Sequence, residues 1–273
     1  MYLIRILVLT AVIGGPAALP LMLAFAQQPA TKSPHPLEPV LKMAERRLEF
    51  IDEEVRDYTC TIIKRERVNG QLGESQFMFA KVRHAGRRNG EMVPFSVYLR
   101  FLKPKAVEGR EVIWIEGRNA NKLVAHETGL LNFKRAWLDP TGYLAMMGQR
   151  YPISEIGMRN LIEELLKKGE RERQFAESEV KEVEGAKVNG RVCKMIQVIH
   201  PVQRPHFEFY KAQIFIDNEL QLPIRYASWT WPTEPNGEPV LEEEYTYTDV
   251  KVNVGLTDED FSPDNSAYNF PSL

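Results

Sequence analysis

The chain has 273 residues with 35 basic and 37 acidic side chains, which gives a formal net charge of −2 at neutral pH. Such a balance lacks the basic surplus of nucleic-acid-binding proteins and argues against a nucleic-acid partner. With 44% hydrophobic and 26% charged residues, the composition is that of an ordinary globular protein with a folded core.

The first residues predict an export signal. Arg5 is the one charged residue among the first 26, and the apolar stretch ends with Ala24, Phe25 and Ala26. A short positive segment, an apolar run and small side chains before the cut are typical of a secretory signal peptide. We expect cleavage between Ala26 and Gln27 and a periplasmic protein. The alternative is an uncleaved anchor, because about 20 apolar residues can span a bilayer.

Residues 27–36 contain three prolines among polar residues and predict a flexible linker. Residues 37–273 are then expected to form a single β-rich domain. Apolar residues between Leu37 and Val55 recur at steps of three and four, which predicts an amphipathic helix. A second stripe of this kind runs from Ile156 to Leu166 and predicts a second helix.

Most of the remaining chain reads as strands. Alternation begins at 58–63, and Asn69-Gly70 is a strong hairpin signal. Further strands are expected at 77–82, 97–102, 112–115, 122–126, 133–138, 180–184, 192–199, 207–216, 223–231 and 240–252. Regular strands joined by short polar turns predict an antiparallel meander. We therefore expect a mainly β (α+β) fold, with about eleven strands in one curved sheet and helices on its concave face.

Motifs that carry chemistry are absent. The five histidines include no pair at the helical spacing of a zinc site, and neither a nucleophile elbow nor a phosphate-binding glycine loop occurs. The sequence thus predicts no catalytic residues, no metal and no cofactor. The acidic runs 242–244 and 258–260 and the basic cluster 83–88 are expected to be solvated surface. A phosphate or lipid-headgroup site is the alternative for the basic cluster.

Two cysteines, Cys60 and Cys193, remain in a chain expected to enter an oxidising compartment. We expect them to form a disulfide, with two buried free thiols as the alternative. Aromatic residues fall mostly within the predicted strands, and core packing accounts for many of them. A curved sheet covered by helices can also hold an apolar cavity. Trp114 and Trp229 are the candidates to line it, and packed core is the alternative for both.

The C-terminal half carries a resemblance. Five features occur there in a fixed order: Phe215-Ile216-Asp217, Leu222-Pro223-Ile224-Arg225, the run 245–250, Asn253-Val254-Gly255-Leu256 and finally Phe261. This order resembles the closing strands of the LolA-like superfamily, which includes outer-membrane lipoprotein carriers and lipoprotein-sorting proteins. The chain looks most like an exported family of this superfamily known only as a domain of unknown function.

The resemblance implies an unclosed β-barrel of about eleven antiparallel strands, with helices plugging its concave side and lipidated or apolar ligands bound there. The stretch 140–168 does not align with the superfamily. We therefore expect an exported, non-catalytic module, peripheral to the membrane at most, that carries or senses a lipid, a lipoprotein or another envelope component. Another envelope protein is a further possible partner. The alternatives are an envelope hydrolase and a structural protein-interaction module with a filled core.

Overall fold

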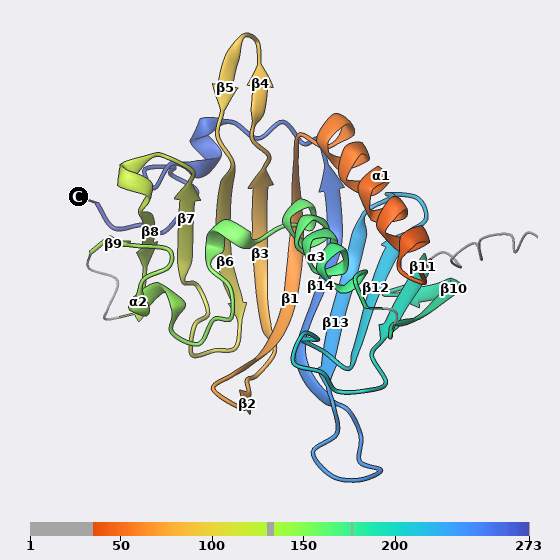
Figure 1. Ribbon diagram of the computed structural model, residues 1–273. Coiled ribbons are helices and arrows are strands. Elements are labelled where there is room, and N and C mark those ends of the chain that lie inside the picture. Colours follow the sequence, from red (N-terminus) through yellow and green to blue (C-terminus); the bar gives the residue numbers. More distant parts are fainter. Residues whose placement is uncertain (1–34, 130–133, 176, 273) are drawn as a thin grey trace, which may run out of the picture. The chain divides into compact units, whose positions relative to one another are not determined.

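One antiparallel sheet dominates the structure, a computed structural model that describes residues 35–129, 134–175 and 177–272 (Figure 1). The first half of the chain supplies β1 (Asp57–Val68), β2 (Gln71–Leu72), β3 (Gln76–Arg83), β6 (Ser96–Lys103), β7 (Glu111–Ile115), β8 (Leu123–His126) and β9 (Ala136–Leu138). The second half supplies β10 (Glu179–Val188), β11 (Arg191–Ile199), β12 (Lys211–Asp217), β13 (Pro223–Thr230) and β14 (Val240–Val252). The predicted signal peptide, its cleavage site and linker residues 27–34 lie outside the described residues.

The eleven strands of the main path pair in the order β10-β11-β12-β13-β14-β1-β3-β6-β7-β8-β9, and β2 pairs with β1. The sheet is open, with β10 at one edge and β9 at the other. Two meanders meet where β14 pairs antiparallel with β1. The expected fold class, a mainly β, antiparallel and unclosed sheet of eleven strands, is confirmed.

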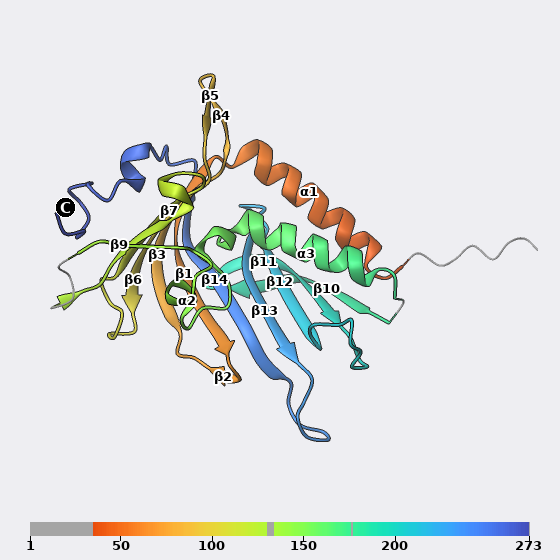
Figure 2. The same cartoon turned by 60° about the vertical axis from the view of Figure 1, so that its left-hand side comes forward.

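Two long helices, α1 (Glu38–Glu54) and α3 (Met158–Glu172), cover one face of this sheet (Figure 2). The chain leaves β9 at one edge and must reach β10 at the other. Residues 139–175 therefore cross the covered face, and they include the short α2 (Tyr143–Met146) and α3. We call residues 139–168 the roof. They include the whole stretch 140–168 that the superfamily resemblance left unaligned.

The roof and α1 share one core with the sheet. Ile51 of α1 and Ile162 of α3 are buried in the same cluster as Tyr58 and Ile62 of β1. Burying an apolar side chain of this size stabilises the fold by about 1.5–3 kcal/mol. The Tyr58 hydroxyl also accepts the backbone N–H of Met158 at 3.1 Å, which fixes the start of α3 over the sheet.

Several expected elements differ in the structure. The strand expected at 207–216 begins at Lys211, since residues 201–210 form a loop that contains two prolines. The basic cluster 83–88 is not simply a solvated turn. Arg83 is buried and ion-paired with Asp258 at 2.7 Å, and His84 is buried as well. The chain then projects as a hairpin of β4 (Gly86–Arg88) and β5 (Glu91–Val93) (Figure 1).

Both cysteines are free and buried, contrary to the expected disulfide. Cys60 lies on β1 and Cys193 on β11, four positions apart in the sheet. At about 4.8 Å per strand their backbones are about 19 Å apart, whereas a disulfide requires Cα atoms within about 7 Å. Burial raises the pKa of the Cys60 thiol, which keeps it protonated. The structure agrees with the alternative of two buried free thiols.

The opposite face of β3, β6 and β7 is covered by the C-terminal segment, residues 253–272. Tyr268 stacks on Tyr98 with ring centroids 4.2 Å apart, and Asp260 pairs with Lys81 at 2.7 Å. Asp258 pairs with Arg83 at 2.7 Å. The acidic run 258–260, expected to be solvated surface, therefore fastens the C-terminal segment to the sheet.

A buried histidine–glutamate pair lies beneath this segment. His126 Nε2 is 3.4 Å from Glu111 Oε2, and neither side chain is exposed to solvent. His126 Nδ1 lies 2.7 Å from the Glu127 carbonyl oxygen, which can only accept, so Nδ1 carries a hydrogen. A second hydrogen on Nε2 would turn the contact with Glu111 into an ion pair. The Asn269 backbone N–H donates to Glu111 at 3.1 Å and joins the C-terminal segment to this pair.

This pair predicts a pH-dependent stability. Burial alone would lower the pKa of His126, but Glu111 and the Glu127 carbonyl outweigh it and raise the pKa above its ordinary value of 6.5. A histidine with a raised folded pKa stabilises the fold fully below its unfolded pKa, and this contribution disappears as pH rises through the folded pKa. The free energy of unfolding, measured by urea denaturation, should therefore fall more steeply above neutral pH in the native protein than in His126→Gln. Parallel pH curves would contradict this, and His206→Gln, at an exposed histidine, is the control.

Candidate functional site

A cavity of about 240 Å³ lies between the sheet and the roof. Its floor is formed by the inward faces of central strands, including Ile62, Met78, Leu99, Phe101, Val112 and Leu123. The roof contributes Leu144, Met147, Ile153, Leu161 and Leu165, and Leu138 lines the cavity from the end of β9. Most of the lining is therefore apolar, and it comes from segments far apart in the sequence.

The period of β1 explains how charge enters this space. Side chains alternate between the two faces of a strand, so residues two apart share a face. Ile62, Lys64 and Glu66 all line the cavity for this reason. Lys64 and Glu66 are each only 7% exposed. Buried charges of this kind need partners, because an unpaired one is costly.

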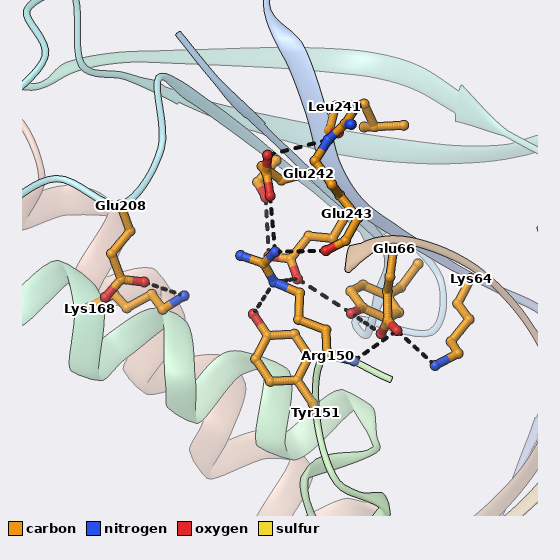
Figure 3. Close-up of polar contacts among 12 residues, drawn as sticks. Lys64, Glu66, Arg150, Tyr151, Lys168, Glu208, Leu241, Glu242 and Glu243 are labelled. Carbon is orange, nitrogen blue, oxygen red and sulfur yellow. Dashed lines mark hydrogen bonds and ion pairs between the residues drawn. The ribbon is translucent and has the colours of Figure 1, made fainter. Parts of the chain in front are cut away.

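The partners meet around Arg150 of the roof, and Lys64, Glu66, Arg150, Glu242 and Glu243 form what we call the Arg150 cluster (Figure 3). Arg150 Nη1 lies 3.0 Å from Glu242 Oε2, and its Nε lies 3.2 Å from Glu243 Oε2. The Arg150 backbone N–H donates to Glu66 Oε2 at 3.1 Å, and Lys64 Nζ lies 3.0 Å from the same oxygen. The roof is thus tied to both β1 and β14 by charged groups.

Neighbouring roof and sheet residues complete the network. Lys64 Nζ donates to Gln149 Oε1 at 2.5 Å. The Tyr245 hydroxyl lies 2.6 Å from Glu66 Oε1, and Ser228 Oγ donates to Glu243 Oε1 at 3.1 Å. Burial, followed by the charges of Glu243 and Glu66, raises the pKa of Tyr245, so its hydroxyl stays protonated and acts as a donor. All four carboxylate oxygens of Glu66 and Glu243 therefore have partners.

The Arg150 cluster corrects one expectation of the sequence analysis. The run 242–244 was expected to be solvated surface, yet Glu243 is 3% exposed and lines the cavity. Glu243, Tyr245 and Tyr247 alternate on β14 and all line the cavity. The signal was present in the strand period, because a polar residue two positions from a buried aromatic residue shares its face.

Neither tryptophan expected to line the cavity does so. Trp114 is 4% exposed and packs edge-on against Phe95 at 5.8 Å, with its Nε1 donating to the Asn121 carbonyl. Trp229 is half-buried, with Lys211 Nζ 4.1 Å from its ring centroid. Apolar surroundings in the sequence identified strand residues, but they did not say which face or which end of the strand each occupies.

Two further observations concern the part of the chain that the structure describes. Within it, no group of three or more His, Cys, Asp and Glu side chains is arranged to hold a metal ion. No helix there is both long and apolar enough to cross a membrane.

Comparison with known families identifies one match: residues 55–270 match DUF1571, described as a protein of unknown function. No curated protein matches the chain.

Three solved structures are similar at low identity. Lipoprotein LppX from Mycobacterium tuberculosis is 11% identical, with 81% of this chain and 98% of that chain covered and a TM-score of 0.44. A DUF1329 family protein from Desulfovibrio piger is 11% identical, with 84% and 98% covered and a TM-score of 0.40. A putative outer membrane lipoprotein-sorting protein domain from Vibrio parahaemolyticus is 13% identical, with 81% and 95% covered and a TM-score of 0.39. At identities of 11–13% the likeness to these structures is one of fold alone.

The Arg150 cluster predicts how the roof is held. Arg150→Met would leave Glu243 buried without its cation, which should lower the free energy of unfolding by about 1–3 kcal/mol. Amide hydrogen exchange should also quicken across residues 143–156. The double variant Arg150→Met/Glu243→Gln should recover part of the loss, because it removes the uncompensated charge.

The matched control for this prediction is Arg204→Met. It breaks the exposed pair with Glu177 at 2.9 Å, and such surface pairs contribute about 0–1 kcal/mol. An Arg150→Met protein no less stable than this control, with unchanged exchange in the roof, would show that the Arg150 cluster does not hold the roof.

Proposed function

The chain belongs to the DUF1571 family of proteins of unknown function, and we propose that it is an exported, non-catalytic module that binds a lipid or the lipid-bearing part of a lipoprotein in its cavity. The observation that carries this proposal is the apolar cavity between the sheet and the roof. Its volume of about 240 Å³ lies just below the range of about 300–1,000 Å³ of ordinary ligand pockets. This size suits one hydrocarbon chain better than a bulky ligand.

The rim of the cavity supports the same proposal. Tyr143, Leu144 and Met147 of the roof are 82%, 62% and 58% exposed. Leu144 and Met147 also line the cavity, so apolar surface continues from solvent into the interior. Exposed apolar side chains grouped in this way mark binding sites more often than ordinary surface.

A structural module with a filled core is less well supported. A protein that only packs would be expected to fill the space under its roof, because interiors are packed closely and apolar walls without a neighbour lose their contacts. A binding role gives this space a use, because an apolar ligand would restore the missing contacts.

Of the five carboxylates that line the cavity, the two buried ones are those of Glu66 and Glu243, and the hydrolase alternative would need them as catalytic groups. Their oxygens are engaged by Lys64, Arg150, Tyr245 and Ser228, so neither is free to act on a substrate. The two histidine–carboxylate contacts of the described residues lie elsewhere, in sites where both histidine side chains are fully buried. Binding is the function that this arrangement supports best.

Filling the cavity should abolish binding. Ala125 of β8 lines the floor, and Ala125→Phe would place a ring in the space that a hydrocarbon chain needs. We expect displacement of a fluorescent apolar probe by phospholipid or monoacylglycerol to weaken by at least about tenfold. The control is Ala186→Phe on the edge strand β10, outside the cavity lining. Equal affinities for two variants of equal thermal stability would contradict the cavity as the binding site.

Export is the second part of the proposal. We expect the protein isolated from its host to begin at Gln27, because the small residues Ala24 and Ala26 precede that bond. Amino-terminal sequencing and intact-mass measurement of the envelope fraction check this. A mature protein that begins at Met1 would support the membrane-anchor alternative instead.

A further inference from the structure

Three cations line the cavity, and each is already held by a carboxylate of the protein. Lys64 Nζ lies 3.0 Å from Glu66, and Arg110 Nη2 lies 2.9 Å from Glu127. The third cation is Lys168 of α3, which pairs with Glu208. A lining cation that already has a close carboxylate partner offers little to an incoming anion, because binding would require exchange of one ion pair for another.

Lys168 is the cation that lines the cavity from the roof side. Its Nζ lies 2.9 Å from Glu208 Oε2, and its side chain is 19% exposed (Figure 3). Glu208 itself is not part of the lining, and its side chain is 55% exposed. This carboxylate therefore neutralises a cavity-lining ammonium group from outside the cavity.

The lining carries five carboxylates against these three cations, and two of the five are paired from outside the lining, Glu243 with Arg150 at 3.2 Å and Glu164 with Lys167 at 2.8 Å. Glu155 and Glu164 lie on the roof side, and within the described residues the Glu155 carboxylate makes no ion pair. Burial, and then the charge of Glu164, raises the pKa of Glu155, as expected where carboxylates lie close together. A further anion at this rim would be repelled by the charge of Glu155.

We infer that the cavity selects a chain-bearing ligand with an uncharged head, such as an alcohol, ester or amide, over one with a carboxylate or phosphate head. This inference rests on the proposed function and names its ligand class. An anionic head would lose its water in a site without an uncompensated lining cation, and a buried charge without a partner is costly. An uncharged head keeps the apolar contacts of the chain without that cost.

The test compares two ligands of equal chain length, dodecanol and dodecanoate, by displacement of a fluorescent apolar probe at neutral pH. The native protein should bind dodecanol at least about tenfold more tightly. Glu208→Gln removes the carboxylate that holds Lys168 and should strengthen dodecanoate binding by about three- to tenfold, with dodecanol binding unchanged. Retention of fold is checked by thermal unfolding.

The matched control is Glu170→Gln, which makes the same charge change on α3. It releases Arg173, a partner of Glu170 at 2.9 Å that does not line the cavity. Its dodecanoate affinity should equal that of the native protein. A gain as large as that of Glu208→Gln would overturn the inference, since net charge alone would then explain the effect.

The remaining outcomes separate this inference from the proposed function. Binding of both ligands by the native protein, with dodecanoate equal or tighter, would overturn the inference while leaving the apolar cavity as a binding site. Displacement of the probe by neither ligand, nor by phospholipid or monoacylglycerol, would instead contradict the proposed function.

Discussion

The sheet is open, and its two edge strands are β9 and β10, which are neighbours along the chain. The rest of the structure depends on this constraint. β9 and β10 follow one another along the chain, yet ten strand spacings separate them in the sheet. The connection between them has to cross a face, and the face it crosses becomes the covered one. A cavity forms there because a single crossing with one long helix does not fill a concave surface of this width as a second sheet would.

Such a crossing needs fixed points, since short helices and turns have little packing of their own. The Tyr58 hydroxyl holds the start of α3, and the Arg150 cluster holds the preceding turn. The roof is held by the charged groups of the Arg150 cluster near the rim and by apolar contacts of α3. Between these two attachments the apolar floor of the cavity stays uncovered. The buried carboxylates are therefore best understood as structural, because the Oε2 atoms of Glu66 and Glu243 bind Arg150 of the roof, and their Oε1 atoms accept from Tyr245 and Ser228 of the sheet.

Local chemistry predicted much of the fold, and long-range geometry accounts for what it missed. Strand alternation, Asn-Gly turns and the helical stripes of α1 and α3 are encoded within a few residues, so they could be read directly. Strand order is not encoded locally. Without it, Cys60 and Cys193 appeared able to pair, although four strand spacings separate them. Trp114 and Trp229 failed as cavity residues for the same reason, because composition does not assign a face or a depth.

The Arg150 cluster could be predicted in part, because the sequence of β1 indicates its charged residues but not the arginine. The alternation that buries Tyr58, Cys60 and Ile62 continues without a break to Lys64 and Glu66, so β1 alone implies a charged pair on the inner face. What β1 cannot supply is the roof arginine that completes the cluster, 84 residues further along from Glu66. Strand β1, at the centre of the sheet, thus contributes to three features: the contact that fixes the start of α3, the cavity floor and the Arg150 cluster. Its pairing with β14 brings the carboxylates of both meanders within reach of one side chain.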